Sequence, residues 1–191
     1  FDISGTVKIN GAGLPGVTVS TSGATATTDS SGNYKLSGLP NGSYILTPTL
    51  AGYRFSPATS TQTIANADKA GVNFTANYVY SSISGKVTEL EVPGYPSAGV
   101  TVNLSGSGIS KSTTTNSAGN YSFSGIRLGS YSVGPYRPGY RFVPTSRSVT
   151  ILEQSATGVD FEGAPLRYNV SGTIRLNGYG LAGVTVTAGL A

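Results

Sequence analysis

The amino-acid sequence repeats itself, and this repetition constrains the fold more than any other feature. The segment Ile3–Val7 returns as Ile83–Val87 and again as Val170–Ile174. Over most of the unit the first two copies are offset by a constant 87 residues, as between Tyr34 and Tyr121. Self-similarity at a fixed period is typical of tandem arrays of one structural unit. The sequence therefore predicts two full copies of a unit and the opening of a third.

Within one copy, apolar residues recur at every second position. Ile3, Val7 and Ile9 fall on one face of an extended segment, while Ser4 and Thr6 fall on the other. Gly, Pro, Asn and Asp separate such segments, and no window shows the period of a helix. About seven short strands at this spacing predict an all-β fold of tandem immunoglobulin-like or transthyretin-like β-sandwich repeats in an elongated rod. After the opening strands, the strand-like segments of the first copy are Ala24–Thr28, Tyr34–Leu36, Ser43–Thr49, Tyr53–Ser56, Thr61–Ile64 and Val72–Ala76.

The repeat pattern also predicts the domain boundaries. We expect one sandwich over residues 1–77, a second over 78–165, and the first two strands of an incomplete third repeat over 166–191. The connectors are short and aromatic, unlike flexible Gly/Ser linkers, so we expect a stiff rod. Two strands alone are marginal in water. Val184 and Val186 therefore need a partner, which is either a continuation of the chain or strands shared by another subunit.

Composition excludes several classes of function. The chain has 191 residues with no His, Cys, Met or Trp, and its net charge is +4. Without His or Cys, the chain lacks the imidazole and thiolate groups of most metal, redox and nucleophilic sites. The cations are spread along the chain, so no phosphate-tracking patch and no nucleic-acid partner are predicted. No apolar run reaches the ~20 residues of a membrane span, and no membrane insertion is expected.

The repeated motifs resemble the carboxypeptidase regulatory-like family, whose members are transthyretin-like or Cna-B-like β-sandwiches. The resemblance rests on Ile3–Val7, Leu14–Val19, Thr28–Tyr34, Leu39–Tyr44 and Gly52–Tyr53, and on their counterparts in the second copy. It implies tandem arrays on bacterial surface proteins, where such modules serve as spacers, stalks or interaction domains. The metallopeptidase domain that gives the family its name is absent from this sequence.

A calcium site is one candidate function for the loop around Asp29 and Asn33, since some related surface modules bind Ca²⁺ through comparable loops. Calcium takes six to eight oxygen ligands, usually with several carboxylates. This loop has one carboxylate, and the second copy has Asn116 in its place. An Asx-type hairpin turn is therefore favoured over a metal site, and no cofactor is predicted.

The family resemblance raises a second possibility, an intramolecular isopeptide bond between Lys8 and Asn73. The alternation that buries Val7 and Phe74 turns both side chains toward solvent. The corresponding residues in the second copy are Thr88 and Asp160. Solvated surface residues are favoured; an intact mass about 17 Da below the sequence value would indicate the bond.

Catalysis is not expected. Glu89 and Glu91 lie two positions apart in a loop rich in Pro and Gly, and they could share a strand face. Paired acids that hydrolyse glycosides face each other across a cleft, and one has a raised pKa. Nothing in the first copy matches this pair, so it is interpreted as a solvated insertion.

Aromatic and guanidinium groups gather where a sugar could stack. Tyr136, Arg137, Tyr140 and Arg141 form such a group in the second copy, and Tyr53 and Arg54 match the last two. The alternative is structural, with the tyrosines closing the end of the sandwich and Arg lying over them. Recurrence in both copies favours the structural role.

Two functions follow from the sequence. The first is an extracellular structural protein of the cell surface, a stalk or filament subunit whose partner is itself through β-edge pairing, end-to-end contact or strand sharing. Few charges protect its sheet edges, which favours such pairing. The second is an adhesion module that binds glycans or other surface proteins through loops such as Glu89–Pro96 and Gly134–Tyr140.

Overall fold

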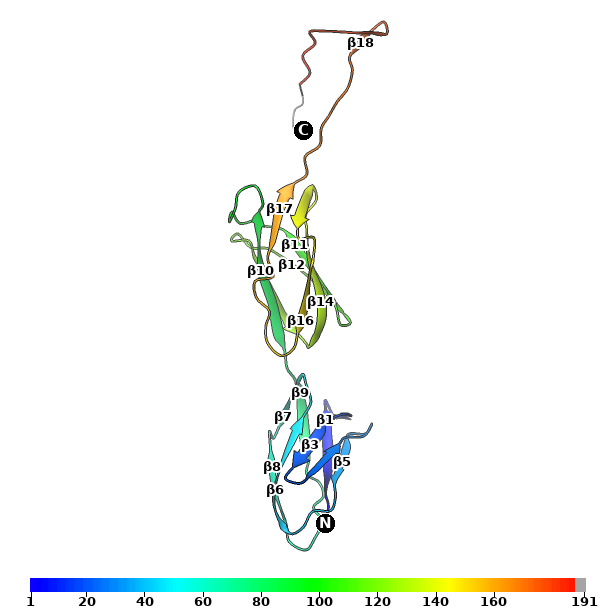
Figure 1. The fold of residues 1–191 in the computed structure, drawn as a ribbon, viewed down its shortest axis with the longest axis vertical. Helices are drawn as coiled ribbons and strands as arrows, with labels where there is room; N and C mark the ends of the chain where they lie inside the picture. Colours follow the sequence, from blue (N-terminus) through cyan, green and yellow to red (C-terminus); the bar gives the residue numbers. More distant parts are fainter. Residues whose placement is uncertain (188–191) are drawn as a thin grey trace.

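The computed structural model describes residues 1–187, and strands are the only regular secondary structure in that range. Two β-sandwiches follow each other along the long axis of the molecule (Figure 1). This arrangement confirms the predicted all-β class of tandem sandwich repeats. The described residues contain no helix of the length and hydrophobicity that crossing a bilayer requires.

The first sandwich packs two sheets against each other. One sheet has the order β2-β1-β9-β7, and β5 pairs with β1 outside that path; the other has the order β4-β3-β6-β8. The β1–β9 pair is parallel, whereas the other pairs are antiparallel. The strands are β1 (Ile3–Ile9), β2 (Ala12–Gly13), β3 (Thr18–Thr21), β4 (Ala24–Thr27), β5 (Asn33–Leu36), β6 (Gly42–Thr49), β7 (Tyr53–Ser56), β8 (Ser60–Ile64) and β9 (Phe74–Tyr78).

The second sandwich repeats this topology. Its sheets have the orders β13-β10-β17-β15 and β12-β11-β14-β16, and the β10–β17 pair is again parallel. The strands are β10 (Ser81–Glu89), β11 (Thr101–Gly106), β12 (Ile109–Thr114), β13 (Asn120–Ile126), β14 (Gly129–Tyr136), β15 (Tyr140–Val143), β16 (Arg147–Ile151) and β17 (Phe161–Pro165).

Each sandwich has its own hydrophobic core. The alternating positions predicted from the sequence point inward, and Ile3 and Val7 of the first sandwich are fully buried, as are Ile83 and Val87 of the second. The two cores share no residue. Burying such side chains contributes about 1.5–3 kcal/mol each, so each sandwich carries a stabilising core of its own.

The last strand of the first sandwich differs from the sequence-based expectation. We expected a strand over 72–76, but β9 runs over Phe74–Tyr78. Two hydrogen bonds hold Val72 just before the strand: its N–H donates to the Ser4 carbonyl (3.1 Å), and its carbonyl accepts from the Tyr34 hydroxyl (2.6 Å). A Cβ on Gly5 would clash with that carbonyl. The close approach of Val72 therefore requires Gly5.

Residues 166–187 lie beyond the second sandwich (Figure 1). The two strands expected for a third repeat are not formed among the described residues. A short hairpin of β18 (Arg175–Leu176) and β19 (Tyr179–Gly180) lies between the two expected segments. The hairpin matches the β1–β2 pair of the first sandwich in position and register. Strand β1 also pairs with β5 and β9, and among residues 1–187 no counterpart of these two strands pairs with residues 170–176.

Candidate functional site

The connection between the two sandwiches is short and is tied back to the first one. Only residues 79 and 80 separate β9 from β10. The Val79 N–H donates to the Gly52 carbonyl at 2.9 Å, and the Leu166 N–H makes the same bond to the Gly139 carbonyl at 2.7 Å. The chain therefore leaves each of the two sandwiches over an equivalent glycine turn.

An arginine of the second sandwich lies on an aromatic cluster of the first. The Arg127 guanidinium carbon is 3.7 Å from the centroid of the Tyr78 ring. Tyr78 in turn packs against Tyr53, with ring centroids 5.2 Å apart, and against Tyr80 at 6.1 Å. A cation over a tyrosine face contributes about 0.5–2 kcal/mol depending on its exposure. This contact therefore joins the second sandwich to the end of β9.

Two further residues of the second sandwich contact the Gly52 turn. Oε1 of Glu153 accepts a hydrogen bond from the Gly52 N–H at 3.1 Å. A Cβ on Gly52 would lie 3.0 Å from the side chain of Leu128, and Gly52 has a φ of +81°. Glycine is favoured here because any side chain would be strained in this conformation and crowded by Leu128. We call the contact formed by Gly52, Tyr78, Arg127, Leu128 and Glu153 the junction.

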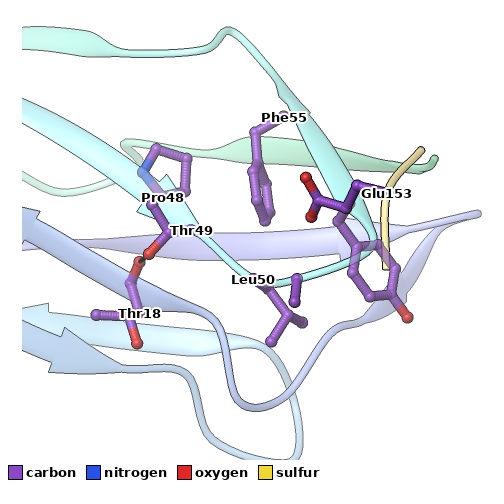
Figure 2. A pocket seen from close by; sticks show the side chains of 8 residues that line it. Thr18, Pro48, Thr49, Leu50, Phe55 and Glu153 are labelled. Carbon is purple, nitrogen blue, oxygen red and sulfur yellow. Dashed lines mark hydrogen bonds between the residues drawn. The ribbon is translucent and has the colours of Figure 1, made fainter. Parts of the chain in front are cut away.

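A cleft of about 520 Å³ opens beside the junction. Figure 2 shows the carboxylate of Glu153 directed toward the ring of Phe55, with Leu50 below them. The first sandwich supplies every lining residue except Glu153. We call this space the junction cleft; it is lined by Thr18, Pro48, Thr49, Leu50, Ala51, Tyr53, Phe55 and Glu153. A second cleft of about 670 Å³ shares Ala51 and Glu153 with it.

The aromatic and guanidinium residues predicted as an interaction site lie together at the far end of the second sandwich. Tyr136, Arg137, Tyr140 and Arg141 all line a cavity of about 220 Å³, which we call the end cavity. The Arg137 guanidinium lies 4.4 Å from the centroid of the Tyr140 ring, while the Tyr136 side chain is 60% exposed. The end cavity corresponds by sequence to the junction cleft, one repeat along the chain.

The Asp29 loop is a closed turn. Oδ1 of Asp29 accepts hydrogen bonds from the N–H groups of Ser31 and Asn33, both at 2.8 Å, and Oδ2 accepts from Asn33 Nδ2 at 3.2 Å. The bonds from Asn33, followed by those from Ser31 and Gly32, lower the Asp29 pKa, although desolvation opposes them. Asn116 makes the corresponding backbone bonds in the second sandwich. These bonds support the Asx-turn interpretation over the calcium one.

The remaining acidic and lysine candidates lie apart. The side chain of Asn73 accepts hydrogen bonds from the Thr6 N–H and hydroxyl, and Lys8 is exposed. Glu89 accepts a hydrogen bond from the Ser97 hydroxyl at 2.7 Å, whereas Glu91 pairs with Arg167 at 2.5 Å. The two glutamates therefore have different partners. Among residues 1–187 no cluster of acids has the composition of a metal site.

The apolar residues expected to need a partner are exposed. Val184 and Val186 are 43% and 75% exposed, and both belong to the segment that follows the second sandwich. The rest of the expected third repeat, residues 188–191, lies outside the described residues. That a continuation of the chain or another subunit covers these valines stays a prediction.

Sequence reasoning missed the junction residues of the second sandwich. At the constant offset, Arg127, Leu128 and Glu153 replace Pro40, Asn41 and Asn66 of the first copy. Such replacements mark positions where the two copies face different surroundings. A comparison of the copies position by position would have found them, whereas a search for shared motifs passes over them.

Comparison with known proteins shows the family. The model of the carboxypeptidase regulatory-like domain matches residues 2–77 and 82–163. The chain belongs to the carboxypeptidase regulatory-like domain family. This confirms the resemblance seen in the sequence, with two tandem copies of the domain.

Among curated relatives, the chain is similar to chitinase ChiA of Flavobacterium johnsoniae. The two are 34% identical over 97% of this chain, but the chain spans only 12% of the length of ChiA. Among solved structures, the TIE protein of Bacillus anthracis matches 86% of this chain and 34% of its own chain, with a TM-score of 0.70 and 15% identity. The minor pilin GBS52 of Streptococcus agalactiae covers 89% of this chain and 99% of its own, at 15% identity and a TM-score of 0.39. At 15% identity the match to the TIE protein shows a shared fold only, and no argument rests on the GBS52 match.

Proposed function

We propose that this pair of carboxypeptidase regulatory-like domains is a stiff, non-catalytic spacer of an extracellular protein. The observation that carries the proposal is the junction. Arg127, Leu128 and Glu153 contact the end of the first sandwich at separate points, across a connection of residues 79–80. Because several contacts surround so short a connection, they restrict both bending and twisting of one sandwich relative to the other. A spacer of this kind would hold neighbouring domains at a set distance.

The boundaries proposed for the spacer follow the repeats: residues 1–77, 78–165 and 166–191. In the structure β9 ends at Tyr78, and Tyr78 itself is part of the junction. The first boundary therefore falls within a strand that serves both the first sandwich and the contact with the second.

The relative ChiA bears on the kind of domain that the spacer could support. Its name identifies an enzyme that acts on chitin, and this chain resembles only a small part of its length. Because this chain has no His or Cys and Glu89 and Glu91 have separate partners, we propose that it supports other domains and performs no chemistry itself.

Small-angle X-ray scattering tests the stiffness of the spacer. The wild-type chain should give a pair-distance distribution with two separated maxima, as expected for two bodies at a fixed distance. The double variant Arg127→Ala/Leu128→Ser should lose the second maximum without a change in β content by circular dichroism. A wild-type curve that requires a broad ensemble of interdomain distances would overturn the proposal.

We extend this proposal to self-association of the spacer. The edge strands β4 and β8 of the first sandwich carry no charged residue. Natural edge strands are usually protected by charge, Pro or a bulge, so a second copy could pair at these edges and build a filament. Electron microscopy of the purified chain tests this, since ordered fibres support pairing and monodisperse short rods limit the proposal to a spacer.

A second candidate function is carbohydrate binding at the end cavity. The observation in its favour is the exposed Tyr136 ring beside Arg137, which lies over Tyr140. The partial resemblance to a chitinase makes chitin the first ligand to test. Wild-type protein should be retained on chitin beads and Tyr136→Ser should not; equal behaviour of the two proteins would exclude this site.

A further inference from the structure

The junction cleft has the chemical character of a binding site. Its volume of about 520 Å³ lies within the usual range of ligand pockets. It is bounded by two sandwiches, and pockets occur preferentially at domain interfaces. Two aromatic rings, Tyr53 and Phe55, line it together with hydroxyl groups and one carboxylate.

We propose that the junction cleft binds a neutral carbohydrate chain. The inference rests on the docked junction of the proposed spacer, and it concerns a site other than the end cavity. Sugar rings combine an apolar face of C–H groups with a rim of hydroxyls. A matching site needs a half-buried aromatic surface beside hydrogen-bonding side chains, and the junction cleft supplies both.

The apolar part of the cleft is built on the core of the first sandwich. Tyr53 and Phe55 are partly buried and pack against that core, as does Leu50. Tyr53 also packs against Tyr78, whose ring carries Arg127. The cleft's aromatic wall is therefore held in place before a ligand arrives, which lowers the entropy lost on binding.

The polar part comes from both sandwiches. Oε1 of Glu153 is held by the Gly52 N–H at 3.1 Å, while Oε2 has no protein hydrogen-bond partner within residues 1–187. Thr18 and Thr49 line the opposite part of the cleft (Figure 2). A carboxylate oxygen accepts hydrogen bonds from hydroxyl groups. The Thr49 hydroxyl donates to the Thr18 carbonyl at 3.4 Å and can still accept a hydrogen bond, whereas the Thr18 hydroxyl can donate and accept. This set suits the hydroxyl rim of a sugar.

The charges at the cleft argue against other ligands. No Lys or Arg lines it, so nothing would neutralise a phosphate or an acidic sugar. One carboxylate is too few for a divalent cation, which takes six or more oxygen ligands in the case of Ca²⁺. Anions and divalent cations are thereby disfavoured, and the threonine hydroxyls of the lining favour a polar, uncharged ligand.

The end cavity provides the matched contrast. There Tyr136 and Arg137 occupy the places of Thr49 and Leu50, and Arg137 lies over the tyrosine that corresponds to Tyr53. The cavity is reduced to about 220 Å³. The open cleft with an acid from the next repeat is therefore specific to the junction.

Titration followed by amide NMR shifts tests the inference with three probes: the hexamer of N-acetylglucosamine, cellohexaose, and the acidic hexamer of galacturonic acid. We expect one or both neutral hexamers to shift the signals of Gly52, Phe55 and Glu153, and the acidic hexamer to leave them unchanged. Phe55→Leu keeps the apolar volume but removes the flat face, and it should weaken binding about fivefold to tenfold. Glu153→Ala should weaken it by a similar factor, whereas Tyr136→Ser should leave it unchanged at these signals.

Two outcomes would overturn the inference: no shift at the cleft with either neutral hexamer at millimolar concentration, or undiminished binding by Phe55→Leu. The contacts that define the junction are made by Gly52 and Tyr78 of the first sandwich and not by Phe55, so scattering from Phe55→Leu should still show a stiff rod. Loss of binding with stiffness intact therefore concerns the cleft alone. A flexible wild-type chain would instead remove the basis of both proposals.

Discussion

The two sandwiches are alike inside and different at the ends that face the N-terminal direction. In the first sandwich, Asn41 and Asn66 hydrogen-bond to each other, with Nδ2 to Oδ1 at 2.6 Å and the Asn66 N–H to Oδ1 at 2.8 Å. In the second, the same positions are Leu128 and Glu153, and both contact the neighbouring sandwich. The comparison teaches that the position of a repeat in the array is encoded in loop residues, while its fold is encoded in the shared core.

The interior devices that fix the fold recur in both copies. Tyr34 and Tyr121 each donate a hydroxyl hydrogen bond to the carbonyl of a valine, Val72 and Val159 respectively. Thr28 and Thr115 are buried and each bridge two backbone groups of their own sandwich. These matched pairs allow the same substitution to be made in each repeat.

The largest expected effect comes from emptying one core at a time. Phe74 and Phe161 occupy corresponding positions and are 2% and 1% exposed. Phe74→Ala should lower the free energy of unfolding of the first sandwich by about 3–5 kcal/mol, and Phe161→Ala should do the same in the second. Urea titration followed by NMR signals of each sandwich measures both. Equal destabilisation of the two sandwiches by either variant would contradict separate cores.

A smaller effect is expected from the buried tyrosine hydroxyls. Tyr34→Phe leaves the Val72 carbonyl without its hydroxyl donor and should cost about 1–3 kcal/mol in the first sandwich. Burial raises the pKa of Tyr34 to about 12. Burial, followed by the nearby charge of Asp160, also raises the pKa of Tyr121.

Their ionisation makes stability depend on alkaline pH. Tyrosine in an unfolded chain ionises near pH 10, so the stabilisation is fully present below about pH 10 and is lost as the pH rises through about 12. Tyr34→Phe should make the stability of the first sandwich less dependent on pH in this range. It should leave the pH dependence of the second sandwich unchanged. Denaturation midpoints measured from pH 8 to pH 12 check the expectation, and an unchanged pH profile for the first sandwich would contradict it.

The comparison is tested directly by giving the second sandwich the residues that the first has at the corresponding end. Leu128→Asn/Glu153→Asn gives the second sandwich the polar pair of the first. We expect a loss of about 1 kcal/mol of coupling between the sandwiches, because one charged hydrogen bond and one apolar contact disappear. Differential scanning calorimetry measures this as a wider separation of the two unfolding transitions. The matched control Asn41→Ala, at the corresponding position of the first sandwich, should leave the coupling unchanged.

The smallest effect is expected at the Asp29 turn, where the second sandwich has Asn116. Hydrogen bonds from the turn hold the Asp29 pKa below its usual value. The stabilisation from this group is present above the ordinary aspartate pKa of about 4 and is lost as the pH falls through the lowered value. Asp29→Asn should remove this acid dependence from the first sandwich, as measured by its denaturation midpoint between pH 2 and pH 5. Added Ca²⁺ should stabilise neither protein.

Much of the fold could be predicted because it depends on local patterns that occur twice. The alternation around Ile3 and Val7 and the Gly turns predict strands and buried faces, and both copies agree. The start of β9 could not be predicted, since it depends on how closely Val72 approaches Gly5 and Tyr34. Hydrogen bonds between distant segments set that limit, and the sequence pattern does not contain them.

The candidate site was only partly predictable for a related reason. Tyr136, Arg137, Tyr140 and Arg141 stand close in sequence, and the structure keeps them together around one cavity. The junction residues come from four separate segments, and Gly52 and Glu153 are 101 positions apart. Arg127 and Glu153 are of residue types that are common in ordinary surface loops. Only the docking of one sandwich on the other gives them a role.

The distribution of distances between the two sandwiches tests the stiffness of the junction most directly. The chain has no native cysteine, so Thr25→Cys in β4 and Ser112→Cys in β12, both exposed, place one spin label on each sandwich. Double electron–electron resonance should give a single narrow distance distribution for this pair, and the distribution should broaden when Leu128→Asn/Glu153→Asn is added. If the distribution is equally broad with and without Leu128→Asn/Glu153→Asn, the junction does not hold the two sandwiches in one orientation.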